Sequence, residues 1–310
     1  MTEHELTFRC MGTDVRLLVP DRAGLDDARQ WLTSFDARLS RFRPESELCA
    51  LNRDRRATVS ASALLRSAVS AGLWAAQRTG GLVDPTVLGA LRSAGYNASL
   101  AGVASAGLAA ALAAAPPRRA ARAHPAARWR RVHVDDAHGV VRRPCGVEVD
   151  TGGTGKGLAA DAVAHRLAAR ERFAVDCGGD LRVGGAAAQR RPYEVEVAHP
   201  FGGEPVHRLW LGPGAIATSG IDARLWRRPD GAFAHHLIDP MTGAPAWTGL
   251  VTVTALAPTA LEAETLAKAA LLSGPRAGAA LLAEHGGVLV HDDGDVQLAG
   301  PLAHTRARAA

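Results

Sequence analysis

The sequence lacks any apolar run long enough to cross a membrane, and its four cysteines include no C-x-x-C pair. A membrane-spanning helix needs about 20 consecutive apolar residues, so we expect no membrane insertion. Without paired cysteines, nothing in the sequence indicates a zinc site or a redox dithiol, and we expect reduced, structural thiols. The N-terminal residues also lack the apolar core of a secretion signal, so we expect a cytoplasmic protein.

Aromatic residues are scarce, at 5% of the chain, and few accompany the arginine-rich stretch 118–143. The formal net charge is +5, which would suit either nucleic acid or a smaller anionic ligand. Nucleic-acid-binding surfaces typically combine basic residues with stacking aromatic residues. We therefore expect no nucleic-acid partner, and a basic nucleic-acid-binding protein remains only a remote alternative.

Neither familiar phosphate-binding loop is present. A P-loop would need glycine in place of Asp150 and Ser or Thr in place of Gly157, and the pattern G-x-G-x-x-G is also missing. Residues 150–161 instead crowd four glycines around Lys156, between a predicted strand and a helix expected to begin near Leu158. Small residues let backbone N–H groups approach a phosphate, while a helix N-terminus and a lysine add positive charge. This glycine-lysine turn is therefore either an anion-binding site or a purely structural connection.

The flanking sequence predicts both strands and helices. Alternating apolar residues over 6–19 predict two strands joined by a turn at 11–13. From Leu25, apolar residues recur at the spacing of an amphipathic helix that ends before Pro44, with acidic residues suited to its first turn. The polar residues 45–52 are expected to form a surface loop. Thr259 predicts the start of a later helix, because a glutamate stands three residues after it.

Six short motifs follow one another in a fixed order. They are Met11-Gly-Thr13, Asp84-Pro85-Thr86, the glycine-lysine turn, Gly178-Gly179-Asp180, Thr218-Ser219-Gly220 and His235-His236-x-x-Asp239-Pro240-x-Thr242-Gly243. In this order the chain resembles the ApbE-type FAD:protein FMN transferases, over about residues 7–300. Each motif alone would be weak, but the ordered set makes coincidence improbable.

The resemblance implies one two-lobed α+β domain over 1–310, T-fold-related, with mixed or antiparallel sheets, packed helices and a variable alanine- and arginine-rich segment at about 98–128. Members of this family bind FAD and transfer its FMN half, through a phosphoester bond, to a threonine or serine of a target flavoprotein. Some members instead hydrolyse FAD or only hold it. An FAD pyrophosphatase or a non-transferring FAD-binding protein is therefore the alternative.

The resemblance also implies which residues form the site. His236 is the candidate general base because imidazole titrates near neutrality, Asp239 would orient it or bind ribose, and Lys156 would supply charge during catalysis. A His-His pair can equally be structural, and Asp84-Pro85-Thr86 can be only a turn. The residues expected to contact FAD are Met11, Asp84, Thr86, Gly153, Gly155, Lys156, Gly178, Gly179, Asp180, Thr218, Ser219, His235, His236 and Ile238.

The sequence departs from the family pattern at its metal site. Most members hold Mg²⁺ with an aspartate, a threonine or serine four residues later, and a backbone carbonyl of the glycine-lysine turn. Here these positions are Glu264 and Lys268, so Glu264 and a carbonyl near Gly155 would be the remaining ligands. A protonated lysine cannot bind a metal. We expect its ammonium group to pair with Glu264 near the place of the ion, which leaves both Mg²⁺ binding and transfer open.

Overall fold

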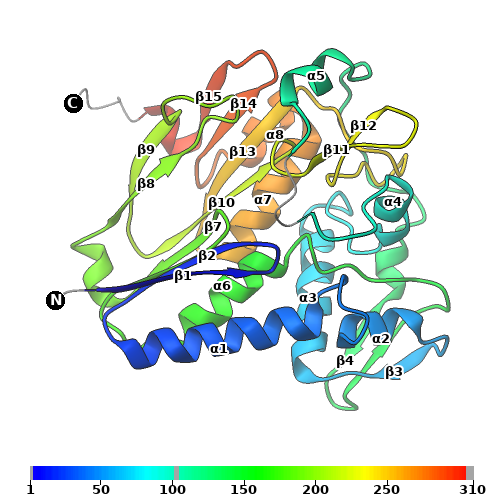
Figure 1. Cartoon of the computed structure of the whole chain (residues 1–310), viewed down its shortest axis with the longest axis horizontal. Coiled ribbons are helices and arrows are strands. Elements are labelled where there is room, and N and C mark those ends of the chain that lie inside the picture. Colours follow the sequence, from blue (N-terminus) through cyan, green and yellow to red (C-terminus); the bar gives the residue numbers. More distant parts are fainter. Residues whose placement is uncertain (1–2, 101–104, 305–310) are drawn as a thin grey trace.

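The computed structural model describes residues 3–100 and 105–304, and its central layer is an eight-stranded antiparallel sheet (Figure 1). Neighbouring strands follow the order β1-β2-β6-β7-β10-β13-β14-β15. The predicted hairpin over 6–19 is confirmed, because β1 and β2 pair on either side of a tight turn. The strands of this sheet are β1 (His4–Cys10), β2 (Thr13–Val19), β6 (Phe173–Cys177), β7 (Asp180–Gly184), β10 (Gly214–Gly220), β13 (Leu250–Ala257), β14 (Gly287–His291) and β15 (Val296–Ala299).

The remaining strands form three small antiparallel sheets. One has the order β3-β5-β4 and lies at one end of the molecule beyond α3 (lower right in Figure 1), and the other two are the pairs β8-β9 and β11-β12. Their bounds are β3 (Thr58–Ser60), β4 (His133–Asp135), β5 (Val140–Arg142), β8 (Tyr193–Val197), β9 (His207–Leu211), β11 (Leu225–Arg227) and β12 (Phe233–His235). Together with the helices, these sheets confirm the predicted α+β class.

None of the helices in the described part of the chain is long and apolar enough to cross a membrane. The α-helices are α1 (Arg22–Leu39), α2 (Glu47–Arg53), α3 (Ala63–Arg78), α4 (Leu88–Ser93), α5 (Leu108–Ala113), α6 (Gly155–Arg166), α7 (Ala260–Ser273) and α8 (Pro275–Leu281). Three short 3₁₀ segments are η1 (Arg128–Arg131), η2 (Ala186–Gln189) and η3 (Gly300–His304).

Side-chain caps begin two helices at places that the sequence did not predict. The first helix begins at Arg22 rather than Leu25, because the Asp21 side chain accepts a hydrogen bond from the Gly24 N–H. The predicted loop at 45–52 is wrong, since most of it forms α2, capped by the Ser46 hydroxyl. The polar composition of this stretch gave no indication of a short helix.

The predicted variable segment 98–128 is mostly irregular where it is described. It contains the short helix α5 and then runs as loop, while its residues 101–104 lie outside the described part. The single-domain organisation over 1–310 stays a prediction.

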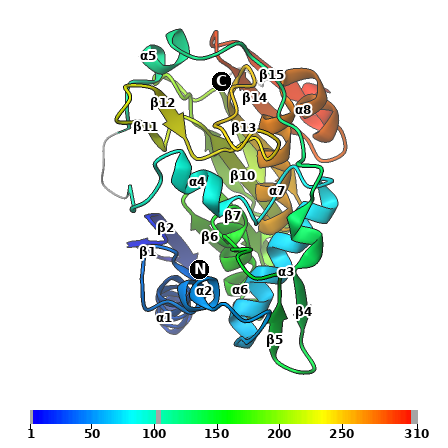
Figure 2. The same cartoon turned by 90° about the vertical axis from the view of Figure 1, so that its right-hand side faces the viewer.

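The two faces of the central sheet pack against different partners. Successive residues of a strand point to opposite faces, so neighbours in β6 enter different clusters: Val175 joins the larger core and Ala174 the smaller one. Helices α6 and α7 pack on the face of the larger core (Figures 1 and 2), whereas the β8-β9 pair contributes Tyr193 and Leu211 to the smaller cluster. The sheet is therefore covered on both sides, and its strand ends are left to form a site.

Helices α6 and α7 approach each other closely at the glycine-lysine turn. A Cβ atom on Gly157 would lie 2.5 Å from the Ala260 carbonyl oxygen, so only glycine fits there. The Asp161 carboxylate accepts hydrogen bonds of 2.9 Å from the backbone N–H groups of Ala260 and Leu261. The Thr259 cap that the sequence predicts completes the start of α7. The first turn of α6 is thus clamped to the first turn of α7.

The β11-β12 pair buries the first histidine of the His-His motif. His235 is fully buried, and its ring meets Trp247 edge-on with centroids 4.8 Å apart. Its Nδ1 accepts a hydrogen bond of 3.3 Å from the Leu237 N–H. His235 is therefore a core residue, whereas His236 follows the end of β12 and is only half-buried.

We expect Gly157→Ala to lower the free energy of unfolding by about 1–3 kcal/mol, because the new methyl group would be forced into the α7 backbone. Gly155→Ala is the matched control, since nothing lies within 4 Å of a Cβ placed there. Urea denaturation of the two variants and the native protein would measure the difference. Equal stabilities for the two variants would contradict the close approach of the helices.

We expect His235 to make the protein less stable as the pH falls. Burial lowers the pKa of His235 from about 6.5, the usual value for histidine, to about 3. Below pH 6.5 the unfolded chain binds a proton at His235 that the folded protein does not bind. The free energy of unfolding therefore falls progressively, by about 2 kcal/mol at pH 5. The measurement is urea denaturation at pH 7.5 and pH 5, for the native protein and for His235→Asn.

In His235→Asn this part of the pH dependence should disappear. His165→Asn, which replaces an exposed histidine of α6, is the control and should keep the native pH dependence. An unchanged loss of stability in His235→Asn would show that His235 is protonated normally in the folded state.

Candidate functional site

The register of β2 and β6 brings two of the predicted motifs together. Val15 pairs with Cys177, so the β1-β2 turn lies against the glycine turn that follows β6. A Cβ atom on Gly178 would lie 2.1 Å from the Thr13 Oγ1. Met11, in the β1-β2 turn, has φ of 53°, a left-handed conformation uncommon for residues other than glycine. A strained, non-glycine turn residue beside a glycine turn is typical of a functional site.

The third motif joins through β10. Ala217 pairs with Asp180 in the sheet, and the Thr218 N–H donates to the Gly179 carbonyl at 3.1 Å. The Thr218 hydroxyl lies 2.8 Å from that of Thr254, while Ser219 is buried beside it. Both glycines of the Gly178-Gly179 turn have positive φ, which explains why this tight approach uses glycine.

Lys156, Asp180, Glu264 and Lys268 form a compact group that we call the lysine-carboxylate cluster. The Lys156 Nζ lies 2.5 Å from Asp180 Oδ2 and 3.9 Å from Glu264 Oε1. The Lys268 Nζ lies 3.7 Å from the same Glu264 Oε1, and Glu264 Oε2 accepts a hydrogen bond of 2.9 Å from the Gly157 N–H. Two ammonium groups therefore share one carboxylate at the first turn of α6.

Burial is the largest single influence on the pKa values of Asp180, Lys156 and Lys268, although nearby charges can outweigh it. It is the largest influence on Asp180, and raises the pKa of that carboxyl although Lys156 opposes it. Burial also pulls the pKa of Lys156 down, but the charges of Asp180 and Glu264 outweigh it, and the pKa of Lys156 rises. For Lys268 burial prevails, so its pKa is lowered despite the attraction of Glu264.

Unpartnered polar atoms gather around the same turn. Buried side-chain polar atoms in proteins nearly always have a hydrogen-bond partner. Seven in the described part of the chain have none, and five of these belong to residues at or next to the glycine-lysine turn or to His236. They are Arg41 Nη2, Asp150 Oδ1, Asp180 Oδ1, His236 Nδ1 and Glu264 Oε1. This group is arranged to receive a polar ligand.

His236 faces the cations of the site. Burial is the first cause that lowers its pKa well below the usual range, and the positive charges of Arg224, Lys268 and Lys156 add to it. Arg224 lies directly before β11, whose Leu225 pairs with His235, and its charge acts on His236. His236 is therefore a neutral imidazole near three positive charges.

Asp239 does not contact His236. Its Oδ1 accepts hydrogen bonds from the N–H groups of Arg122 (2.9 Å) and Met241 (3.0 Å), and its Oδ2 accepts one from the Thr242 hydroxyl. Arg119 adds an ion pair at 3.7 Å. The structure thus shows Asp239 organising its own turn and the loop at 119–122, rather than orienting the histidine.

The Asp84-Pro85-Thr86 turn lies next to the start of the glycine-lysine turn. Asp84 Oδ1 accepts hydrogen bonds from the Thr86 N–H (2.7 Å) and hydroxyl (2.6 Å), which closes the turn on itself. The Pro85 carbonyl accepts a hydrogen bond of 2.8 Å from the Asp150 N–H. Burial raises the pKa of Asp84, although the two hydrogen bonds from Thr86 oppose the change.

Two arginines of this region were not identified from the sequence. The Arg41 guanidinium lies 4.1 Å from the ring centroid of Phe42 and 4.2 Å from that of Tyr96, and pairs with Asp150 at 3.6 Å. Ile238 packs into the same aromatic group. Arg224 is the second arginine that was not identified from the sequence. Neither belongs to a short motif, and the chain holds many arginines, so composition offered no signal for them.

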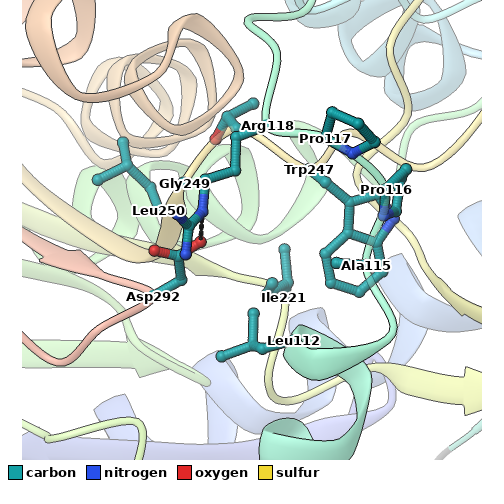
Figure 3. Close-up of a pocket in the computed structure, with 11 residues that line it drawn as sticks. Leu112, Ala115, Pro116, Pro117, Arg118, Ile221, Trp247, Gly249, Leu250 and Asp292 are labelled. Carbon is teal, nitrogen blue, oxygen red and sulfur yellow. Dashed lines mark hydrogen bonds and ion pairs between the residues drawn. The ribbon is translucent and has the colours of Figure 1, made fainter.

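A separate hollow of about 250 Å³ lies beside Trp247 (Figure 3). Its walls come from the loop after α5, from Ile221 and from the start of β13, and the ion pair between Arg118 and Asp292 crosses one side. None of the predicted site residues lines it. The lysine-carboxylate cluster is therefore not part of this cavity.

The residues present do not fit the Mg²⁺ site that the family resemblance implies. Magnesium requires several oxygen ligands in near-octahedral geometry. Within the described ranges 3–100 and 105–304 no three His, Cys, Asp or Glu side chains gather as a metal site. Glu264 Oε2 is taken by the Gly157 N–H, and Glu264 Oε1 lies between two ammonium groups. Both carboxylate oxygens of the predicted ligand Glu264 therefore face nitrogen donors, and no cluster of further His, Cys, Asp or Glu side chains in the described part of the chain completes a metal site.

Comparisons with known proteins agree with the geometry. An FAD:protein FMN transferase from Treponema pallidum is 30% identical over 288 residues, which cover 86% of this chain and 75% of that protein. One from Salmonella typhimurium is 40% identical over 121 residues, covering 37% of this chain and 34% of that protein.

Solved structures show the same fold. The ApbE protein of Thermotoga maritima has a TM-score of 0.79 at 24% identity and covers 96% of this chain and 97% of that chain. The flavin transferase ApbE from Vibrio cholerae has a TM-score of 0.75 at 21% identity and covers 97% of this chain and 98% of that chain. The model of the ApbE family matches residues 11–290. The predicted resemblance is confirmed, and the chain belongs to the ApbE family.

Proposed function

We propose that the protein is an FAD:protein FMN transferase, which binds FAD and transfers its FMN half to a threonine or serine of a target flavoprotein. The observation that carries this proposal is the group of buried polar atoms without hydrogen-bond partners at the glycine-lysine turn, where separate motifs of the chain meet. The names of the relatives from Treponema and Salmonella support it.

The phosphate groups of FAD would lie at the lysine-carboxylate cluster. A diphosphate requires positive charge and N–H donors, and the first turn of α6 offers both its helix N-terminus and Lys156. Lys268 and Arg224 add charge from α7 and from the residue before β11. By the family resemblance, Met11, Gly178, Gly179, Asp180, Thr218 and Ser219 would line the flavin side.

The adenosine end would reach the group around Arg41. A guanidinium held against two aromatic rings, with one nitrogen unpartnered, offers a hydrogen-bond donor beside a flat apolar surface. Asp150 Oδ1 has no hydrogen-bond partner there, so it could accept a hydrogen bond from a ribose hydroxyl. Asp84 and Thr86 adjoin this end through the contact of Pro85 with Asp150.

The transfer step requires a base beside the phosphorus. The hydroxyl oxygen of the acceptor attacks the phosphorus of the FMN half, the P–O bond to the AMP half breaks, and a phosphoester forms as AMP leaves. His236 would accept the hydroxyl proton, since it is neutral and faces the cations that hold the diphosphate. Asp239 would act only by fixing the turn after it, and no step here is assigned to a metal ion.

The test combines the purified protein, FAD and a peptide containing a candidate acceptor threonine, with mass spectrometry to detect the peptide–FMN adduct and free AMP. The native protein should form both in equal amounts. AMP without adduct would identify an FAD pyrophosphatase, and FAD binding without either product would identify a binding protein.

We expect His236→Ala to keep FAD but to lose turnover by about 10²- to 10⁴-fold, the usual effect of removing a general base. Fluorescence quenching of FAD would measure binding, and AMP release would measure turnover. His165→Ala, at an exposed site on α6, is the control and should behave as the native protein. Normal turnover in His236→Ala would exclude this histidine as the base.

We also expect the acid limb of kcat/KM to lie at lower pH than that of kcat. In the free enzyme, burial and three cations lower the pKa of His236, whereas a bound diphosphate opposes those cations and raises it again. Rate falls as the pH drops through this pKa, because a protonated imidazole accepts no proton. The measurement is AMP release against pH at low and saturating FAD. Coinciding acid limbs would contradict the placement of His236 beside the phosphates.

A further inference from the structure

Lysine is almost absent from this protein. Of 36 basic residues other than histidine, only Lys156 and Lys268 are lysines, and both belong to the cluster at the glycine-lysine turn. Both side chains are largely buried, with 17% and 13% exposed. Every other such cation is arginine. The site therefore uses the compact ammonium group where the rest of the chain uses guanidinium.

Lys268 lies directly over the turn. A Cβ atom on Gly153 would lie 3.7 Å from the Lys268 Cε, so the side chain of Lys268 crosses the turn just where a larger residue would touch it. Its Nζ lies 3.7 Å from Glu264 Oε1, which is an ion pair without a hydrogen bond. Among the described residues none accepts a hydrogen bond from this ammonium. Its three donors are thus available to a ligand.

We propose that the Lys268 ammonium takes the place of a divalent cation, so that this protein holds the diphosphate of FAD with two lysines and without Mg²⁺. The proposal rests on the proposed function, because it concerns the same site and the same ligand. Its basis is the donor set: Glu264, the carboxylate nearest both lysines, is already bound on one oxygen by a backbone N–H and flanked on the other by two ammonium groups.

The charges of the site agree with this assignment. The positive charges of Lys156, Lys268 and Arg224 all act on His236, and together they would attract an anion to this place. A diphosphate beside Lys268 favours its protonated form, because an opposite charge stabilises the ammonium. An ammonium is also a compact, freely rotating donor that fits between phosphate oxygens, whereas a guanidinium has a fixed planar fork.

The first experiment titrates FAD into the native protein, followed by fluorescence quenching, in EDTA and in millimolar Mg²⁺. Equal affinity in both is expected. A gain in affinity of about tenfold or more with Mg²⁺, comparable to a charged hydrogen bond, would overturn the proposal while leaving the proposed function intact. Absence of FAD binding in both solutions would overturn the proposed function itself.

Substitutions at Lys268 separate charge from metal binding. Lys268→Thr, which supplies a hydroxyl ligand, should bind FAD about 10- to 100-fold more weakly in EDTA and regain affinity in Mg²⁺. Lys268→Arg should bind FAD more tightly than Lys268→Met, and neither should respond to Mg²⁺. Arg276→Thr removes one charge from an exposed position of α8 and is the control. Native FAD affinity in Lys268→Met would overturn the proposal.

Two measurements on the native protein do not depend on any variant folding. Electron paramagnetic resonance with Mn²⁺ as the probe should show no protein-bound metal in the presence of FAD, and a bound signal at one ion per FAD would overturn the proposal. Reductive methylation of amines should modify Lys268 in the free protein and spare it when FAD is bound. Equal modification with and without FAD would show that Lys268 does not touch the ligand.

Discussion

The ion pairs of Glu264 hold the candidate site together. One oxygen fixes the first turn of α6 through the Gly157 N–H, and the other faces both Lys156 and Lys268. The side chain is buried, so its charge is tolerable only because these partners surround it. The contact also requires Gly157, whose missing side chain lets α6 approach α7. Backbone packing and electrostatics therefore depend on each other at this point.

The charges of the site are held at a cost to stability. Asp180, Glu264 and both lysines are largely removed from water, and within the described protein Asp180 Oδ1 and Glu264 Oε1 have no hydrogen-bond partner. A buried charge without a full set of partners destabilises the folded state. The rest of the molecule compensates through a covered sheet and tightly clamped helices. Such an arrangement is typical of a site prepared for a charged ligand.

Lys268 shows how one substitution changes the chemistry of a shared fold. The fold matches that of the solved ApbE structures, and α7 places the Lys268 ammonium 3.7 Å from Glu264. A lysine supplies one positive charge that is tethered to the helix and needs no coordination sphere. Under our proposal, this ammonium would balance part of the charge of the diphosphate.

The sequence by itself determined the local features: the β1-β2 hairpin, the Thr259 cap of α7, the glycine-lysine turn and the departure at Lys268, all set by neighbouring residues. It also predicted the α+β fold, through its ordered motifs. The tertiary structure decided which side chains meet. It brought Asp180 to Lys156, buried His235 against Trp247, and gave Asp239 hydrogen-bond partners other than His236. Strand register and burial set these contacts between distant residues, and no local pattern encodes either.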